Sequence, residues 1–300
     1  GTDQSKTEAT TQSKRSAQRE RVLNALLMTI LLLTGACVGS FINVVAWRLP
    51  REESVVWPGS HCPRCGHSVQ WHDNIPVIGW LALRGRCRNC DQPISARYPI
   101  VEALSAGLWL TAAWAIGLGA GTVSADSVTT LVTLVGGVVL ISLLMPLVLI
   151  DIDHLWLPEP ICRAGVISGL LATGLVAAFS EQQTDGSLLF NHLLASAAGL
   201  LVLEALSALA ERLVGQPALG LGDAKLAAMA GAWLGLAGLG IAMGVAVISG
   251  ALFGVMGRIT GRLKPREPFP FGPFIAVGIW LVWLMGSEWW WSQWVTLIGP

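Results

Sequence analysis

Long runs of apolar residues recur along this chain, and they constrain its fold more than any other feature. Segments such as 129–150 and 239–257 contain no charged residue and approach the roughly 20 apolar residues that a helix needs to span a bilayer. Only 13% of all residues are charged, whereas about a quarter is usual in soluble domains. Lipid offers no water to backbone N–H and C=O groups, so spanning segments must be helical. The sequence therefore predicts an all-α polytopic membrane protein.

We expect about eight transmembrane helices. Their predicted bounds are 22–45, 99–118, 129–150, 161–179, 188–210, 224–237, 239–257 and 273–290. Only a short glycine-containing turn separates the sixth from the seventh, so one long or broken helix is an alternative. The predicted organisation is a disordered polar tail over 1–21, a first span over 22–45, a loop domain over 46–98, a transmembrane domain over 99–290 and a tail over 291–300.

Basic residues are distributed unevenly between the connections, and this predicts the orientation. The loop 46–98 contains seven arginines, whereas the connections around 119–128, 180–187 and 288–300 contain neither Lys nor Arg. The positive-inside rule then places the loop 46–98 in the cytoplasm. The polar tail, with five basic residues, is the exception. We expect the bilayer, and no nucleic acid, as a partner of these segments.

The loop 46–98 carries four cysteines in two CxxC pairs, with 21 residues between the pairs. They are Cys62, Cys65, Cys87 and Cys90. Two such pairs can place four thiolates around one ion, which is typical of a tetrahedral Zn²⁺ site. Four thiolates leave no open position, so the metal would be structural. Disulfides or redox chemistry are the alternatives, but a reducing cytoplasm disfavours them. We expect the nearby histidines to be exposed loop residues: His61, His67 and His72.

Three aspartates lie at the edges of predicted spans, where charges are costly. Asp151 and Asp153 follow the apolar run 129–150, and Asp223 lies at the start of the sixth span within "GLGDAKL". The alternation of the spans brings these acids to the same cytoplasmic face. Ionisable residues at membrane depth are functional candidates by default. A single one would be an ordinary interfacial acid, but a pair indicates a shared site.

A pair of carboxylates in a low-dielectric site favours hydrolysis of a peptide bond. The two acids share a proton, so the ionised one can activate water while the protonated one polarises the carbonyl. Gly220 and Gly222 would let the backbone beside Asp223 turn sharply and approach a peptide closely. Lys225 either acts on the charge of Asp223 or extends toward lipid headgroups. A hydrolytic metal site around Asp151 is a weaker alternative, because no HExxH-type spacing supports it.

Five blocks of the sequence, taken together, resemble bacterial type IV prepilin peptidases of the GxGD class of intramembrane aspartic proteases. In chain order they are "GSFINVVAWRLP" at 39–50, "CPRCGHSVQWHDNIPVIGWLALRGRCRNCDQPISARYPIVE" at 62–102, "IDIDHLWLPE" at 150–159, "GLGDAKLAAMAGAWLG" at 220–235 and "FPFGPFIAVG" at 269–278. The blocks keep the order that the family has.

The resemblance implies removal of a short basic leader from type IV prepilins or type II secretion pseudopilins, at the cytoplasmic face of the bacterial inner membrane. The family's catalytic pair corresponds to Asp223 and to Asp151, which opens a D-x6-P pattern ending at Pro158. Asp153 is the rival for the second role. Glu159 departs from the Asp that the family often has there, and it keeps the charge.

The resemblance also implies a second activity in many members, namely N-methylation of the new N-terminus with S-adenosylmethionine. The region 46–102 is its expected seat, although no glycine-rich nucleotide loop supports it independently. Acids that face the cytoplasm are candidate partners of a basic leader, with ordinary solvated charge as the alternative. They are Glu52, Glu53, Asp73 and Asp153.

Two functions of other classes compete with the peptidase. One is a non-enzymatic assembly factor of a pilus or secretion machine, in which the cysteine loop docks another component. The other is a transporter that uses the acids as a proton relay. Leader cleavage by the purified protein distinguishes the peptidase from both.

Overall fold

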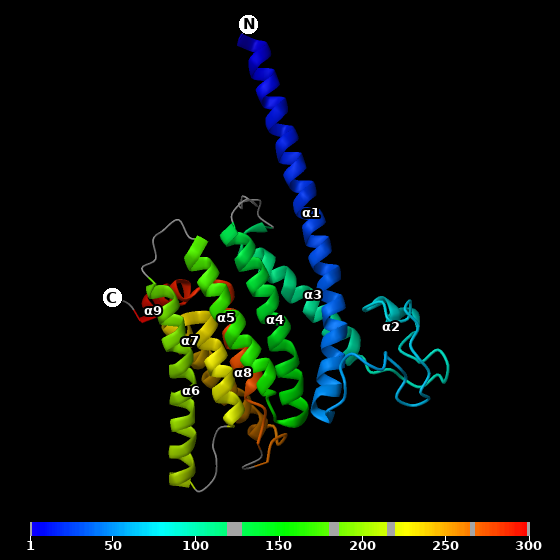
Figure 1. The fold of residues 1–300 in the computed structure, drawn as a ribbon, viewed down its shortest axis with the longest axis vertical. Helices are drawn as coiled ribbons and strands as arrows, with labels where there is room; N and C mark the ends of the chain where they lie inside the picture. Colours follow the sequence, from blue (N-terminus) through cyan, green and yellow to red (C-terminus); the bar gives the residue numbers. More distant parts are fainter. Residues whose placement is uncertain (1, 119–127, 180–185, 215–219, 265–267, 299–300) are drawn as a thin grey trace. The chain divides into compact units, whose positions relative to one another are not determined.

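The computed structural model describes residues 2–118, 128–179, 186–214, 220–264 and 268–298, and these residues are predominantly helical (Figure 1). The elements are α1 (Thr2–Arg48), the 3₁₀ helix η1 (Leu49–Arg51), α2 (Ile78–Ala82), α3 (Arg97–Ala115), α4 (Val128–His154), α5 (Glu159–Phe179), α6 (Ser187–Val214), α7 (Leu221–Ile259), α8 (Gly272–Met285) and α9 (Ser287–Ile298). The only extended pairings within these ranges are two isolated bridges in the cysteine loop, His61–Ser68 and Arg86–Pro93.

The polar segment at the start of the chain differs from the prediction. The sequence predicts a disordered tail over 1–21, but α1 is helical from Thr2 onward. Between Thr2 and Arg21 there is no Gly or Pro, and Ala, Gln, Lys, Glu and Arg, which favour helices, are frequent. The helix that begins in the apolar run can therefore continue backward through this polar stretch.

The chain divides into two compact units, of which the first comprises residues 1–40 and 61–130. Within it, α3 packs closely against α1. A Cβ on Gly39 would lie 2.7 Å from the Cα of Glu102, and one on Gly35 would lie 3.0 Å from the Cα of Ala106. Small residues at such crossings let two helix backbones approach, which is the usual basis of helix association in membranes.

The second unit comprises residues 41–60 and 131–300 and contains α4 to α9. Helix α7 is its centre, since it packs against α5, α6 and α8. A Cβ on Gly231 would lie 2.3 Å from the backbone of Ala195 in α6, and one on Gly278 of α8 would lie 2.4 Å from the carbonyl oxygen of Ala242. Because glycine has no side chain, the backbone of α7 lies directly against the backbones of α6 and α8 at these two crossings.

Helix α7 folds back on itself at Gly235, which has φ 68° and ψ −177°. A Cβ on Gly222 would lie 2.9 Å from Leu157, and one on Gly272 would lie 3.3 Å from the same leucine. A Cβ on Gly250 would lie 3.0 Å from the residue preceding Gly272. A straight helix would separate residues 222 and 250 by about 42 Å. The chain therefore reverses at Gly235, which separates the predicted sixth and seventh spans into two helical parts.

Side chains of α6 satisfy the backbone groups that this break leaves open. Asn191 accepts a hydrogen bond from the Leu236 amide at 3.1 Å, and the Nδ1 atom of His192 lies 3.0 Å from the Ala232 carbonyl oxygen. Breaks in membrane helices are tolerated where neighbouring helices supply such partners. These hydrogen bonds from α6 therefore stabilise the reversal at Gly235.

Five helices in the described part of the chain are long and apolar enough to cross a membrane. These segments are Lys14–Arg51, Val128–His154, Glu159–Phe179, Ser187–Leu213 and Leu221–Ile259. Helices α8 and α9 would make a sixth if they form one broken span, but they are bent by 92°. The structure therefore supports five or six such helices, and the predicted number of eight is not confirmed. This number counts α7 once, although its two parts on either side of Gly235 correspond to two predicted spans, and it does not include α3.

Candidate active site

Asp151 lies in the last turn of α4 and is buried, with 5% of its surface exposed. Its Oδ2 atom accepts a hydrogen bond from the backbone N–H of Gly272 at 2.9 Å. Gly272 is the first residue of α8. A Cβ at this glycine would lie 2.7 Å from the same carboxylate oxygen. The start of α8 is therefore shaped around Asp151, and only a residue without a side chain fits there undisturbed.

Asp223 lies in the first turn of α7 and is also buried, with 9% of its surface exposed. Its Oδ2 atom accepts a hydrogen bond from the backbone N–H of Gly220 at 3.1 Å. An acid three residues into a helix that reaches back to the N-cap amide is a common helix start. The glycine motif thus fixes the orientation of the Asp223 carboxylate.

Leu157 connects the surroundings of the two aspartates. Its side chain is buried, and it lies against Gly222 beside Asp223 and against Gly272 beside Asp151. The sequence placed these two acids 72 positions apart, and the fold brings their surroundings together around one leucine.

Asp153, the predicted rival of Asp151, lies elsewhere on the helix. Two residues along an α-helix correspond to a rotation of about 200°, so the two side chains leave α4 on opposite sides. Asp153 is exposed, whereas Asp151 is buried and holds the start of α8. Of the two, the geometry brings only Asp151 into contact with Gly272.

Lys225 contacts an acid that the sequence analysis did not assign to it. Its Nζ atom donates a hydrogen bond to Glu159 at 2.7 Å, and the other oxygen of Glu159 accepts one from Arg163 at 2.5 Å. Glu159 is the first residue of α5, so the Glu159–Lys225 ion pair joins the start of α5 to the start of α7. The structure shows this ion pair at Lys225, two residues from Asp223, and the two predicted roles of Lys225 stay predictions.

The four loop cysteines lie together, as their spacing predicts. The sulfur atoms of Cys62, Cys65, Cys87 and Cys90 all lie within 4.8 Å of one another, and none forms a disulfide. The Sγ atoms of Cys62 and Cys90 are 3.9 Å apart. Sulfurs of a tetrahedral zinc site with Zn–S bonds of about 2.3 Å are separated by about 3.8 Å. The arrangement could therefore hold one metal ion.

The two CxxC turns share one backbone geometry. In the first, the Cys62 amide donates to the His67 carbonyl at 2.9 Å, and in the second the Cys87 amide donates to the Gln92 carbonyl at 2.9 Å. The backbone N–H of His67 lowers the pKa of the Cys65 thiol to about 6, with help from Asn89. A lowered thiol pKa favours the thiolate that binds metal. The three loop histidines are exposed and do not belong to the cluster.

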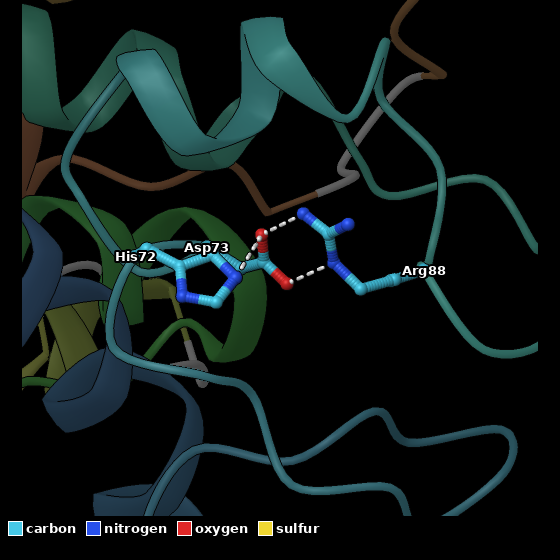
Figure 2. Close-up of polar contacts among 3 residues, drawn as sticks. All are labelled: His72, Asp73 and Arg88. Carbon is cyan, nitrogen blue, oxygen red and sulfur yellow. Dashed lines mark hydrogen bonds and ion pairs between the residues drawn. The ribbon is translucent and has the colours of Figure 1, made fainter.

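An ion pair attaches the second cysteine turn to the rest of the loop (Figure 2). Two nitrogens of Arg88 donate to the two oxygens of Asp73 at 2.7 and 2.6 Å. Hydrogen bonding to this guanidinium holds the pKa of Asp73 below its usual value. His72 lies 3.6 Å from the same carboxylate. Asp73 was a candidate partner of a basic leader, but in the structure it is engaged by Arg88.

Two segments, which together make up most of the chain, match known protein families. Residues 33–116 match the bacterial peptidase A24 N-terminal domain, and residues 138–255 match the type IV leader peptidase family. The first segment contains the four cysteines, and the second contains Asp151 and Asp223. No solved structure is significantly similar to the chain.

Several curated bacterial proteins are similar over most of their length. A protein of Aeromonas hydrophila is 33% identical over 287 residues, which cover 88% of this chain and 92% of the relative. A protein of Pseudomonas aeruginosa is 32% identical over 88% of this chain and 91% of the relative. One of Myxococcus xanthus is 38% identical over 80% of this chain and 66% of the relative. All three are named prepilin leader peptidase/N-methyltransferase.

Proposed function

This chain belongs to the type IV leader peptidase family, and we propose that it cleaves prepilin leader peptides with Asp151 and Asp223 as a catalytic dyad. One observation carries the assignment of the dyad. Each aspartate is buried, each is fixed by one backbone amide through its Oδ2 atom, and both adjoin glycines packed on Leu157. Family membership favours this enzyme over a non-enzymatic assembly factor or a transporter.

The arrangement of the carboxylates suggests how the reaction proceeds. The amides of Gly272 and Gly220 engage one oxygen of each acid, which leaves the other oxygen of each for the reaction. The ionised acid accepts a proton from water, and the protonated acid donates a hydrogen bond to the scissile carbonyl. Water then adds to the carbonyl carbon. Breakdown of the tetrahedral intermediate breaks the C–N bond and returns a proton to the leaving amine.

The substrate is a prepilin or pseudopilin, whose basic leader lies at the cytoplasmic face while its apolar helix enters from the lipid. The excess of arginine in the loop 46–98 supports this orientation in the inner membrane. We assign the first span to residues 22–45, the cysteine domain to 46–98 and the peptidase domain to 99–290. The family match at 138–255 lies within the proposed peptidase domain, and the match at 33–116 contains the whole cysteine domain together with parts of both neighbouring segments.

The cysteine cluster is proposed as a structural Zn²⁺ site. Four thiolates within 4.8 Å of one another fit a closed tetrahedral ion. The metal would stabilise a loop whose described residues contain two short helical elements, η1 and α2, between α1 and α3. Such a site leaves no position for substrate, so zinc has no part in the cleavage step.

The second proposed activity is N-methylation of the newly exposed N-terminus with S-adenosylmethionine. The names of the relatives support it, and we expect its seat in the region 46–102. The cofactor would supply the methyl group. No individual residue is assigned to the cofactor.

Reconstitution with a purified prepilin tests the two activities separately. Leader cleavage is followed by mass spectrometry, and methylation is followed with a pilin that already lacks its leader. Asp223→Ala should abolish cleavage and retain methylation of the processed pilin, because the dyad serves only hydrolysis. Cleavage at the wild-type rate in Asp223→Ala would remove that residue from the mechanism. No cleavage by the unmodified protein would favour the assembly-factor alternative.

A further inference from the structure

The loop that carries the cysteines also presents an apolar surface formed by α2 and the turns before it. We call residues 71–83 the α2 segment. Its Trp71 is 81% exposed, Ile78 is 62% exposed and Leu81 is 60% exposed. Ile78 and Leu81 are three residues apart and therefore share one face of α2. Large apolar side chains this exposed on one short segment indicate a surface that contacts something other than water.

The opposite side of the α2 segment is packed, so its exposed residues are not simply those of an unfolded loop. The indole N–H of Trp80 donates to the Ile94 carbonyl at 3.0 Å. Gly85 packs on the same indole ring, and a Cβ on Gly79 would lie 2.1 Å from the Asp73 carbonyl oxygen. These contacts hold one face of the α2 segment against the rest of the loop, so the exposed residues on its opposite face point in a defined direction.

The start of α2 is attached at the depth of the apolar part of α1. The Val77 amide donates to the Glu102 carboxylate of α3 at 2.6 Å. Glu102 is buried, and its Cα lies where a Cβ on Gly39 would be only 2.7 Å away. Gly39 belongs to the apolar run 22–45 of α1, and α1 is a candidate membrane span.

The residues of α3 on either side of this attachment are apolar and exposed. Ile100 is 55% exposed and Leu104 is 54% exposed. They bracket Glu102 along the helix, so the medium at this depth suits apolar side chains. The α2 segment is attached to this part of α3 through the Val77–Glu102 hydrogen bond.

The charges of the segment agree with a place at the boundary between lipid tails and headgroups. Asp73 is its only acidic or basic residue apart from His72. Arg88 pairs with both oxygens of Asp73, whose side chain is only 7% exposed (Figure 2). Directly after the segment follow Arg84 and Arg86, both exposed. Basic residues beside an apolar surface suit the anionic headgroups of a cytoplasmic leaflet.

We propose that the α2 segment is embedded in the cytoplasmic headgroup region of the bilayer, with Ile78 and Leu81 toward the lipid tails and Arg84 and Arg86 toward the phosphates. The Asp73–Arg88 pair links this segment to the second cysteine turn. The segment thereby holds the cysteine cluster at the membrane surface.

The test places a small environment-sensitive fluorescent amino acid, by genetic incorporation, at position 78 or 81 of the full chain. A third chain carries it at Gln92, an exposed residue of the second cysteine turn. Each protein is reconstituted in nanodiscs of phosphatidylethanolamine and phosphatidylglycerol, with or without bromine on the acyl chains. Retained leader cleavage shows that the peptidase domain is folded, and retained zinc shows that the cysteine loop is folded. If the protein labelled at 78 or at 81 fails these checks, the other one serves for the test.

Brominated lipid should quench the probe at positions 78 and 81 several-fold more strongly than at position 92. Aqueous iodide should show the reverse order. Quenching by iodide at 78 and 81 as strong as at 92 would overturn the proposal, because the segment would then face water. Access by neither quencher would also overturn it, since the surface would then be covered by protein.

Discussion

Replacement of Gly272 by alanine tests the dyad through a residue that is not itself an acid. The added Cβ would lie 2.7 Å from the Oδ2 atom of Asp151. Ordinary van der Waals contact begins at 3.4 Å, so the carboxylate or the start of α8 must move by about 0.7 Å. The structure gives Gly272 no left-handed backbone angle, so alanine is compatible with the helix itself. The perturbation therefore acts mainly on Asp151, and the next neighbour of the added Cβ is Leu157 at 3.3 Å.

Two estimates of how far Gly272→Ala lowers kcat agree with each other. A hydrogen bond to a charged group contributes about 1.5–3 kcal/mol, which corresponds to a rate change of about 10- to 150-fold. Displacement of a catalytic group by about 1 Å costs about 100-fold. We therefore expect Gly272→Ala to lower kcat for leader cleavage by about 100-fold, with a much smaller change in KM.

The assay is cleavage of a purified prepilin by the reconstituted protein, with rates measured at several substrate concentrations. Gly244→Ala is the matched control, because a Cβ at Gly244 meets no atom within 4 Å. Its kcat should equal that of the unmodified protein. A Gly272→Ala protein that cleaves at the unmodified rate would refute the argument that the start of α8 holds a catalytic Asp151.

Three further predictions concern other ties in the fold. Glu159→Lys and Lys225→Glu should each lower kcat about tenfold, and the double exchange should restore most of it, because the ion pair joins the starts of α5 and α7. Cys62→Ser should abolish stoichiometric zinc binding, measured by elemental analysis of the purified protein. Gly235→Ala should lower the free energy of unfolding by about 1–3 kcal/mol, since its φ of 68° and ψ of −177° suit only glycine, and thermal unfolding in detergent measures this.

Two control variants show whether the effects on kcat and on zinc binding are specific to the residues changed. Arg163→Ala removes the other partner of Glu159, within the same helix, and should leave kcat nearly unchanged. Cys37→Ser alters a cysteine outside the cluster and should retain zinc. A double exchange of residues 159 and 225 that is no better than the single changes would contradict the positioning role of the ion pair. Unchanged zinc in Cys62→Ser, or unchanged stability in Gly235→Ala, would contradict the corresponding structural argument.

Several features of the site followed from the sequence because they depend on residues close together in the chain. The CxxC spacing predicted the cluster of four sulfurs, and the structure brings them within 4.8 Å of one another. The apolar runs predicted helices, and the resemblance to prepilin peptidases is confirmed by the family match and by the relatives. The alternation of spans predicted a common side for Asp151 and Asp223. That these two acids form the catalytic pair stays a prediction.

Other features depend on contacts between distant segments, which a single sequence does not specify. The packing of Gly272 on Asp151 joins positions 121 residues apart, and the Lys225–Glu159 pair joins positions 66 residues apart. The motif "FPFGPF" was part of the resemblance, but its contact with Asp151 required the fold. The helical tail differs from the prediction, and the predicted number of eight spans is not confirmed. Propensity extends α1 through its polar part, and the reversal at Gly235 divides α7 into two helical parts that correspond to the predicted sixth and seventh spans.

The most direct test of the central claim compares Asp151→Asn with Asp153→Asn in leader cleavage. Asparagine keeps the size of the side chain and an oxygen that can accept the Gly272 hydrogen bond, but it cannot exchange a proton with water or substrate. The dyad predicts loss of cleavage in Asp151→Asn and near-normal cleavage in Asp153→Asn, which alters an exposed side chain. Cleavage that survives in Asp151→Asn and disappears in Asp153→Asn would contradict the account.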